Sequence, residues 1–210
     1  MPARSRKESI RLQTPKGIEL NLKVLDIQML ADEARCAIQK DSGDDPDITN
    51  GIEVCARVEL TEAGISIDGG EGIGRVTKPG LDQPPGAAAI NSVPRKMIAA
   101  AVSDIAETCD YHGGFRIVVS VPNGAELASR TYNPRMGIEG GISIIGTTGI
   151  VEPMSNSALV DTIRLEERMR REEGWFVCDT GSHAGTRVRN KQITEPTLVQ
   201  IGDKIRMGST

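Results

Sequence analysis

Two long glycine-rich stretches constrain this chain most, because they are too long to be plain connections between helices and strands. The first covers residues 69–94 and holds six glycines and four prolines. The second covers residues 131–153 and surrounds the apolar run 142–145. Loops of this length in compact domains are usually either functional or disordered. Apolar residues run through the first stretch, which shows no low complexity, and this favours a functional loop over disorder.

The segments around these stretches predict a mixture of strands and helices. Apolar and polar residues alternate on both sides of the turn-forming Pro15-Lys16-Gly17, which predicts a hairpin over residues 10–27. Residues 29–40 fit either a short helix or a strand. Further strands are predicted at 52–60, 65–67 and 115–122, and helices at 95–109, 125–130 and 157–172, the last with Leu159 and Ile163 turned inward. This alternation predicts an α+β (mixed α/β) fold with two or three helices and long loops rich in glycine and proline.

Composition excludes several classes of partner. The net charge is −4 and aromatic residues make up 2% of the chain, so we expect no nucleic-acid partner. No apolar run is long enough to span a bilayer, and the basic start lacks the apolar stretch of a secretory signal, so no membrane partner is expected. Four cysteines without a CxxC pair predict reduced thiols in a cytoplasmic protein. Two histidines make a bound metal a poor expectation, and a homo-oligomer is left open.

The first glycine-rich stretch does not contain a known nucleotide fingerprint. Gly70 and Gly72 would need a third glycine at position 75, which is Arg75, and no helix is predicted to begin there. Two interpretations remain open. The glycines either form a tight connection after a strand, or they expose amides that bind a polycarboxylate together with Arg75 and Lys78.

Two other polar segments leave similar alternatives. The loop 41–47 is rich in carboxylates but lacks the ligand spacing of an EF-hand, so an acidic turn is the preferred interpretation. Residues 146–152 offer glycines, hydroxyls and one carboxylate after an apolar strand, and a binding loop is as well supported there as a structural turn. His112 is predicted to be a turn residue rather than a base, and Ser143 to be buried in its strand.

Several long motifs together resemble the cobalt-precorrin-5B C(1)-methyltransferase family of anaerobic cobalamin biosynthesis. They occur in the family's order and cover roughly residues 15–170. The motifs are SGDDPDITNGIEVCARVEL (42–60), GGEGIGRVTKPGL (69–81), AINSVPRKMI (89–98) and VSVPNGAELASRTYNPRMGIEGGISIIGTTGIVEPMS (119–155).

The resemblance implies a function and a set of site residues. S-adenosylmethionine (SAM) would methylate carbon C-1 of cobalt-precorrin-5B to give cobalt-precorrin-6A, and the cobalt would belong to the tetrapyrrole substrate rather than to a protein site. The cations that would hold the substrate's acetate and propionate groups are Arg75, Lys78, Arg95 and Arg135. The residues that would bind the donor or the edge of the macrocycle are Gly146, Thr147, Thr148 and Gly149. The carboxylates that would act on a ring proton are Asp44, Asp45, Asp47 and Glu152, and none of them is singled out as catalytic.

The chain also departs from the family pattern at both ends. The family's glycine-, threonine- and alanine-rich opening is replaced by a short basic leader, and the resemblance fades after about residue 171. We therefore expect a leader at 1–9, a methyltransferase-like domain at 10–172 and a divergent tail at 173–210. The alternative function is a truncated, non-catalytic member that keeps part of the tetrapyrrole-binding fold. A metal- or nucleotide-binding domain is a third hypothesis for the function. The methyltransferase reading requires that the two glycine-rich stretches converge in space.

Overall fold

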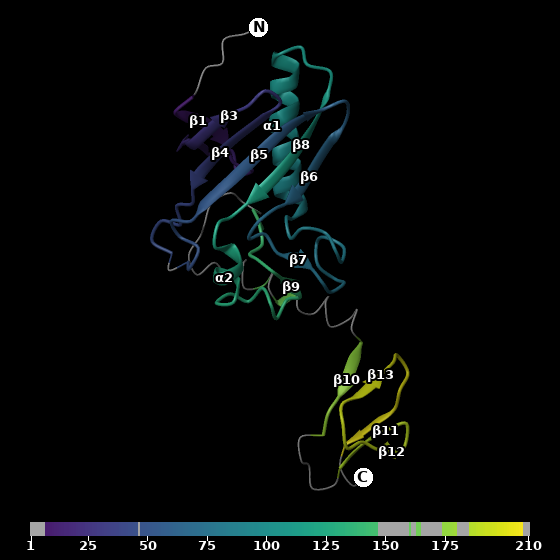
Figure 1. Cartoon of the computed structure of the whole chain (residues 1–210). Coiled ribbons are helices and arrows are strands. Elements are labelled where there is room, and N and C mark those ends of the chain that lie inside the picture. Colours follow the sequence, from purple (N-terminus) through teal and green to yellow (C-terminus); the bar gives the residue numbers. More distant parts are fainter. Residues whose placement is uncertain are drawn as a thin grey trace. The chain divides into compact units, whose positions relative to one another are not determined.

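The computed structural model describes residues 7–45, 47–146, 160, 163–164, 174–179 and 185–207. The chain divides into two compact units. One contains Met1–Lys78 and Asp82–Asn156, and the other contains Pro79–Leu81 and Ser157–Thr210. The described residues form mixed sheets with two α-helices, so the predicted α+β fold is confirmed (Figure 1).

A five-stranded sheet organises the first unit. Its strands, in spatial order, are β3 (Leu25–Met29), β4 (Glu33–Gln39), β5 (Glu53–Thr61), β8 (Gly114–Ser120) and β6 (Ile65–Gly69). β8 is antiparallel to β5 but parallel to β6. β5 and β6 are consecutive in sequence, yet β8 lies between them, so the two predicted strands at 52–60 and 65–67 do not pair with each other.

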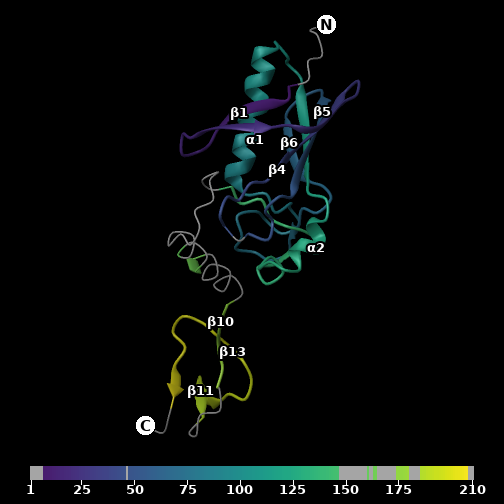
Figure 2. The same ribbon diagram turned by 90° about the vertical axis from the view of Figure 1, so that its left-hand side faces the viewer.

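The parallel pair of β6 and β8 requires a long crossover, because parallel strands cannot be joined by a tight turn. That crossover contains α1 (Ser92–Thr108), which lies against one face of the sheet (Figure 2). Phe115, Ile117 and Val119 of β8 are buried, whereas Arg116 is exposed. The core combines these side chains with residues of α1 and of both glycine-rich stretches.

The helix α1 begins three residues before its predicted start. Pro94 falls in the first turn, where a residue without an amide hydrogen is tolerated. The Oδ2 atom of Asp82 accepts hydrogen bonds from the amide of Ser92 at 2.6 Å and from its hydroxyl at 2.7 Å. This carboxylate satisfies one of the amides that a helix start leaves without a partner. The short helix predicted near 125–130 is α2 (Gly124–Ala128).

The predicted hairpin is present over its first part. β1 (Ser9–Gln13) pairs antiparallel with β2 (Glu19–Lys23), and Gly17 in the turn has a φ of +81°. The alternating pattern continues beyond Lys23, but the chain there enters the main sheet as β3, whose pairing with β4 contains an irregularity. The ambiguous segment 29–40 is therefore a strand, since β4 lies between two partners that complete its hydrogen bonds.

The second unit contains two small sheets. β10 (Trp175–Val177) pairs with β13 (Thr197–Val199), and β11 (Thr186–Val188) lies between β12 (Lys191–Gln192) and β14 (Ile205–Met207). Arg189 forms a hydrogen-bonded ion pair with Asp203. The hydrogen bond from its guanidinium lowers the pKa of Asp203 to about 2.

Most of the predicted helix at 157–172, including Leu159, lies outside the described residues. Val160, Ile163 and Arg164 are helical. The Ile163 side chain is 59% exposed, so its predicted inward position is wrong.

None of the described helices is both long enough and apolar enough to cross a membrane. All four cysteines are free thiols. Burial raises the pKa of the Cys36 thiol, which keeps this half-buried group protonated and uncharged at neutral pH.

Candidate functional site

The two glycine-rich stretches converge at the carboxyl ends of β6 and β8. The amide of Ile142 donates to the Gly72 carbonyl at 2.9 Å, and the Gly74 amide donates to the Ile142 carbonyl at 2.9 Å. The Ile144 amide donates to the Ala89 carbonyl at 2.8 Å. Short strands join the same segments, because β7 (Arg75–Val76) pairs with β9 (Ile138–Glu139). We call residues 69–77, 87–91 and 137–146 the glycine junction.

The run 142–145 is held in the glycine junction by isolated bridges rather than as a regular strand. Ile142 pairs with Ile73, and Ile144 pairs with Ile90. Ser143 is half-buried rather than buried, and its hydroxyl donates to the Asn133 side chain at 3.2 Å. The prediction of a buried strand serine is therefore wrong, because the segment lies over the end of the sheet and not within it.

The glycines of the junction allow main chain to pack on main chain. A Cβ atom on Gly72 would lie 1.9 Å from the Val121 carbonyl oxygen, and one on Gly141 would lie 2.4 Å from the Gly72 carbonyl oxygen. The amides of Gly70 and Gly74 donate to carbonyl groups of the protein. The expectation that these glycines offer free amides to a ligand is therefore wrong at both positions.

Arg75 is held by the end of β6. Its guanidinium donates to both carboxylate oxygens of Asp68, at 2.6 and 3.1 Å, and to the Gly69 carbonyl at 2.9 Å. The hydrogen bond from Arg75 lowers the pKa of Asp68, and the same bond raises the pKa of Arg75. Arg75 thus fastens β7 to the end of β6.

Arg95 binds three main-chain carbonyl groups. It donates to Ile67 and to Ile90 at 2.7 Å each, and to Ala88 at 3.3 Å. Ile90 and Ala88 are fully buried, so these carbonyls have no access to water. Arg95 therefore joins the first turn of α1, the end of β6 and the segment 88–90, which is a positioning role.

Lys78 and Arg135 lie at the edge of the junction. The stem of Lys78 packs on the turn at Gly137, where a Cβ atom would lie 2.5 Å from the Lys78 Cγ. The amide of Thr77 donates to the Gly137 carbonyl at 2.7 Å and so holds the two segments together. Arg135 is exposed, and its guanidinium carbon lies 5.6 Å from the centre of the Tyr132 ring, which is cation–π distance.

The acidic loop lies at the same end of the sheet as the junction, because Cys55 near the start of β5 pairs with Ser120 at the end of β8. Burial acts to raise the pKa of Asp47. Hydrogen bonds from the Lys40 ammonium and from the amide and hydroxyl of Thr49 outweigh it and lower that pKa to about 2. Asp47 thus closes its own loop.

The other two acidic candidates of this loop, Asp44 and Asp45, are exposed and half-buried, respectively. Among the described residues, no group of three acidic, histidine or cysteine side chains is arranged to hold a metal.

Of the residues predicted to bind the donor, only Gly146 lies within the described part of the chain. Its φ is +54°, and a Cβ atom there would lie 3.4 Å from the Pro94 ring, so this end of the junction rests on the first turn of α1. Thr147, Thr148 and Gly149, together with the acidic candidate Glu152, lie outside the described residues.

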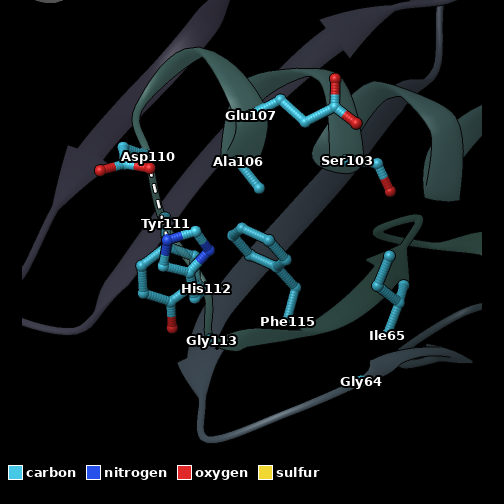
Figure 3. Close-up of a pocket in the computed structure, with 10 residues that line it drawn as sticks. All are labelled: Gly64, Ile65, Ser103, Ala106, Glu107, Asp110, Tyr111, His112, Gly113 and Phe115. Atoms are coloured by element: carbon cyan, nitrogen blue, oxygen red, sulfur yellow. Dashed lines mark ion pairs between the residues drawn. The ribbon is translucent and has the colours of Figure 1, made fainter.

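A hollow of about 520 Å³ lies at the other end of the parallel strand pair, and sequence reasoning missed it (Figure 3). The rings of Tyr111 and Phe115 line it with their centres 5.3 Å apart, and the Tyr111 hydroxyl donates to the Thr61 carbonyl at 3.0 Å. His112 lies in the turn before β8, and its Nε2 is 3.3 Å from the Asp110 carboxylate. The sequence signal for this hollow was the close spacing of Tyr111 and Phe115, two of the few aromatic residues in the chain.

Comparison with known proteins agrees with the motifs. The CbiD family model matches residues 2–153, and an FHA domain model matches residues 162–208. A cobalt-precorrin-5B C(1)-methyltransferase from Ruminiclostridium cellulolyticum is 53% identical over 159 residues, which cover 76% of this chain and 41% of that protein. Its counterpart from Thermoanaerobacter sp. (strain X514) is 47% identical over 199 residues, covering 93% of this chain and 54% of that protein. The second alignment extends into the segment that the FHA model also matches.

A solved structure supports the same relationship. The crystal structure of the cobalamin biosynthesis protein CbiD from Archaeoglobus fulgidus is 29% identical, with a TM-score of 0.53, and the match covers 77% of this chain and 51% of that one. The chain spans about half the length of the curated relatives it matches. The resemblance stated from the motifs is confirmed, and the chain belongs to the CbiD family.

Proposed function

We propose that this chain serves the SAM-dependent methylation of carbon C-1 of cobalt-precorrin-5B, which gives cobalt-precorrin-6A. One observation carries the proposal. The CbiD family match covers both glycine-rich stretches, and these stretches meet in one hydrogen-bonded junction. Ligands of sheets with parallel strands commonly bind beyond the carboxyl ends of those strands, where this junction lies.

The reaction asks little covalent chemistry of the protein. When bound, SAM supplies a methyl group on a sulfonium, and the sulfur leaves as a neutral thioether. The task of the protein is to hold the acceptor carbon in line with that methyl group and to keep water away. Gly146, Thr147, Thr148 and Gly149 are the residues we assign to the donor, and Gly146 is the described one. The cobalt arrives as part of the substrate.

The four cations predicted to bind substrate carboxylates differ in what surrounds them. Arg75 and Arg95 each bind main-chain carbonyls, so we assign them to positioning the junction. Lys78 and Arg135 stand at its edge and are the two we assign to the acetate and propionate groups of the substrate. Asp44, Asp45 and Glu152 are the carboxylates to test for removal of the ring proton. Asp47 is a weaker choice because its hydrogen bonds hold its own loop.

We divide the chain into a leader at 1–9, a methyltransferase-like domain at 10–172 and a separate tail at 173–210. The CbiD family match at residues 2–153 and the FHA match at residues 162–208 support two parts in the chain, with a change between residues 153 and 162. The cytoplasm is the compartment we assign to the reaction, and four free thiols support it. The tetrapyrrole is the partner we assign, and a homo-oligomer is a further hypothesis.

The direct test is incubation of the 210-residue chain with methyl-labelled SAM and cobalt-precorrin-5B. We expect the label to appear in the tetrapyrrole. The relative from Ruminiclostridium cellulolyticum serves as the positive control under the same conditions. If that relative transfers the label and this chain binds the tetrapyrrole without transferring it, the non-catalytic alternative replaces the proposal.

A further inference from the structure

A second hollow, of about 1120 Å³, lies between the β1–β2 hairpin and one flank of α1. Pockets that bind small molecules usually measure about 300 to 1,000 Å³, so this hollow has room for a large ligand. The hollow of Figure 3 is less than half that size. None of the described residues singled out in the sequence as site residues lines the larger hollow.

The helix side of this hollow is apolar and shallow. Met97, Ala100, Ala101 and Ile105 line it, and the Ile105 side chain is 61% exposed. Alanine methyl groups leave the helix surface nearly flat, so a planar ring can lie close against it. From Met97 to Ile105 the helix rises by about 12 Å, which is long enough to support a macrocycle.

The hairpin side carries the positive charge. Lys7 and Arg11 line the hollow together with the amide side chains of Gln13 and Asn21, and Asp104 is the acidic residue among the lining side chains. Arg11 makes a 3.9 Å ion pair with Glu19 across the hairpin, and both side chains are well exposed. Exposed pairs of this length are weak, so the guanidinium is available to a stronger partner.

The apolar side of the hollow continues along α1 toward Pro94, on which Gly146 packs. Pro94, Met97 and Ala101 recur at the spacing that places side chains on one flank of a helix. Gly146 packs on Pro94, at 3.4 Å from the position its Cβ would take. The apolar floor of the hollow therefore runs along the helix toward Gly146, the described one of the residues we assign to the donor.

We propose that the macrocycle of the tetrapyrrole substrate lies in this hollow, with its flat face on Ala100 and Ala101 and with carboxylates at its edge bound by Lys7 and Arg11. The inference rests on the proposed function, because it takes the substrate from there. It places the ring beside α1, and the carboxylates on the side of the ring away from Lys7 and Arg11 are those left for Lys78 and Arg135. An apolar floor with a cationic rim complements an apolar ring with anionic groups at its edge.

The test is an absorbance titration of the full 210-residue chain with cobyrinic acid, a cobalt corrinoid with free carboxylates at its edge. The fully amidated corrinoid serves as the uncharged comparison. We expect the acid to bind, and the amidated form to bind at least tenfold more weakly. Arg11→Glu and Ala101→Trp should each weaken binding of the acid at least tenfold, the first by repulsion and the second by filling the floor.

Lys23→Glu is the matched control, because it makes the same change of charge on the same hairpin at an exposed position that does not line the hollow. It should bind like the wild type. The thermal unfolding midpoint of each variant shows that it is folded. Arg135→Gln should weaken binding less than Arg11→Glu does.

Three binding results would overturn the inference. They are no binding by the wild type, wild-type affinity of Arg11→Glu, and a larger loss in Arg135→Gln than in Arg11→Glu. A dimer that dissociates in Ala101→Trp without a change in corrinoid affinity would assign the hollow to a second copy and overturn it as well. Methyl transfer is measured separately, so binding in the hollow without transfer would contradict the proposed function alone.

Discussion

The guanidinium of Arg95, in the first turn of α1, donates a 2.7 Å hydrogen bond to the carbonyl oxygen of Ile67 in β6. The same side chain binds the buried segment 88–90. The arginine thus connects three parts of the chain that local sequence pattern cannot relate to each other.

Replacement of this arginine tests its structural role. Arg95→Met removes the side-chain donor of the buried Ile90 carbonyl, while the Ala88 carbonyl keeps the Ile90 amide, so the free energy of unfolding should fall by about 2 kcal/mol. Lys96→Met is the control, since Lys96 is exposed on the same helix turn and its loss should change stability by less than about 0.5 kcal/mol. Urea denaturation measures both. Equal midpoints for the two variants would show that the three hydrogen bonds contribute nothing.

The close approach of main chain at Gly72 predicts a severe effect of the smallest side chain. In Gly72→Ala the new Cβ would meet the Val121 carbonyl at 1.9 Å, and the backbone has a φ of +71°. We expect a loss of more than about 4 kcal/mol, or failure to fold.

Gly140→Ala separates the steric clash from the cost of the positive φ. Gly140 has a similar φ of +78°, but no atom lies within 4 Å of its Cβ position. It should cost only about 1 to 2 kcal/mol, the price of the left-handed conformation. Thermal unfolding of both variants decides the matter. Similar losses would mean that crowding at Gly72 is relieved by a backbone shift.

The acidic loop predicts a defined dependence of stability on pH. The pKa of Asp47 falls from 3.8 to about 2 on folding, and its side chain is 24% exposed. A lowered folded-state pKa stabilises the protein above the unfolded pKa, and that contribution disappears as the pH falls from about 4 to 2. Asp47→Asn should lose about 2 kcal/mol at pH 7 and little at pH 2. Unfolding free energies measured between pH 2 and 7 test this, with exposed Asp44→Asn as the control that keeps the wild-type profile.

The hollow of Figure 3 depends on one tyrosine hydroxyl. Tyr111→Phe keeps the ring contact with Phe115 but removes the bond to the Thr61 carbonyl, so we expect a loss of about 1 kcal/mol. Tyr132→Phe is the control, because the Tyr132 side chain is 70% exposed. Hydrogen exchange at the amides of residues 111–115 should accelerate in Tyr111→Phe alone. Unchanged exchange in that variant would contradict the role of the hydroxyl.

Several elements were predictable from the sequence because their signals are local. The hairpin of β1 and β2 follows from alternation around Pro15–Gly17, and α1 follows from apolar residues at helical spacing. The strand β8 follows from a short β-branched run between glycines and Pro122. The family was recognisable for a related reason, since several long motifs occur in a fixed order along the chain.

Long-range pairing decided the rest. The segment 29–40 is a strand because β3 and β5 flank it, and β5 and β6 are separated because the crossover inserts β8 between them. The glycines and cations of the first stretch, together with Arg95 directly after it, suggested a ligand-binding surface. The fold instead packs the glycines against main chain and directs Arg75 and Arg95 to carbonyl groups.

The sequence by itself determined the strands and helices with local periodicity, the membership in the family and the two stretches that had to meet. Only the tertiary structure decided what each polar side chain faces at that meeting point. The partner of a hydrogen-bond donor is the acceptor that the fold brings within about 3 Å of it. The type of residue alone does not reveal that distance.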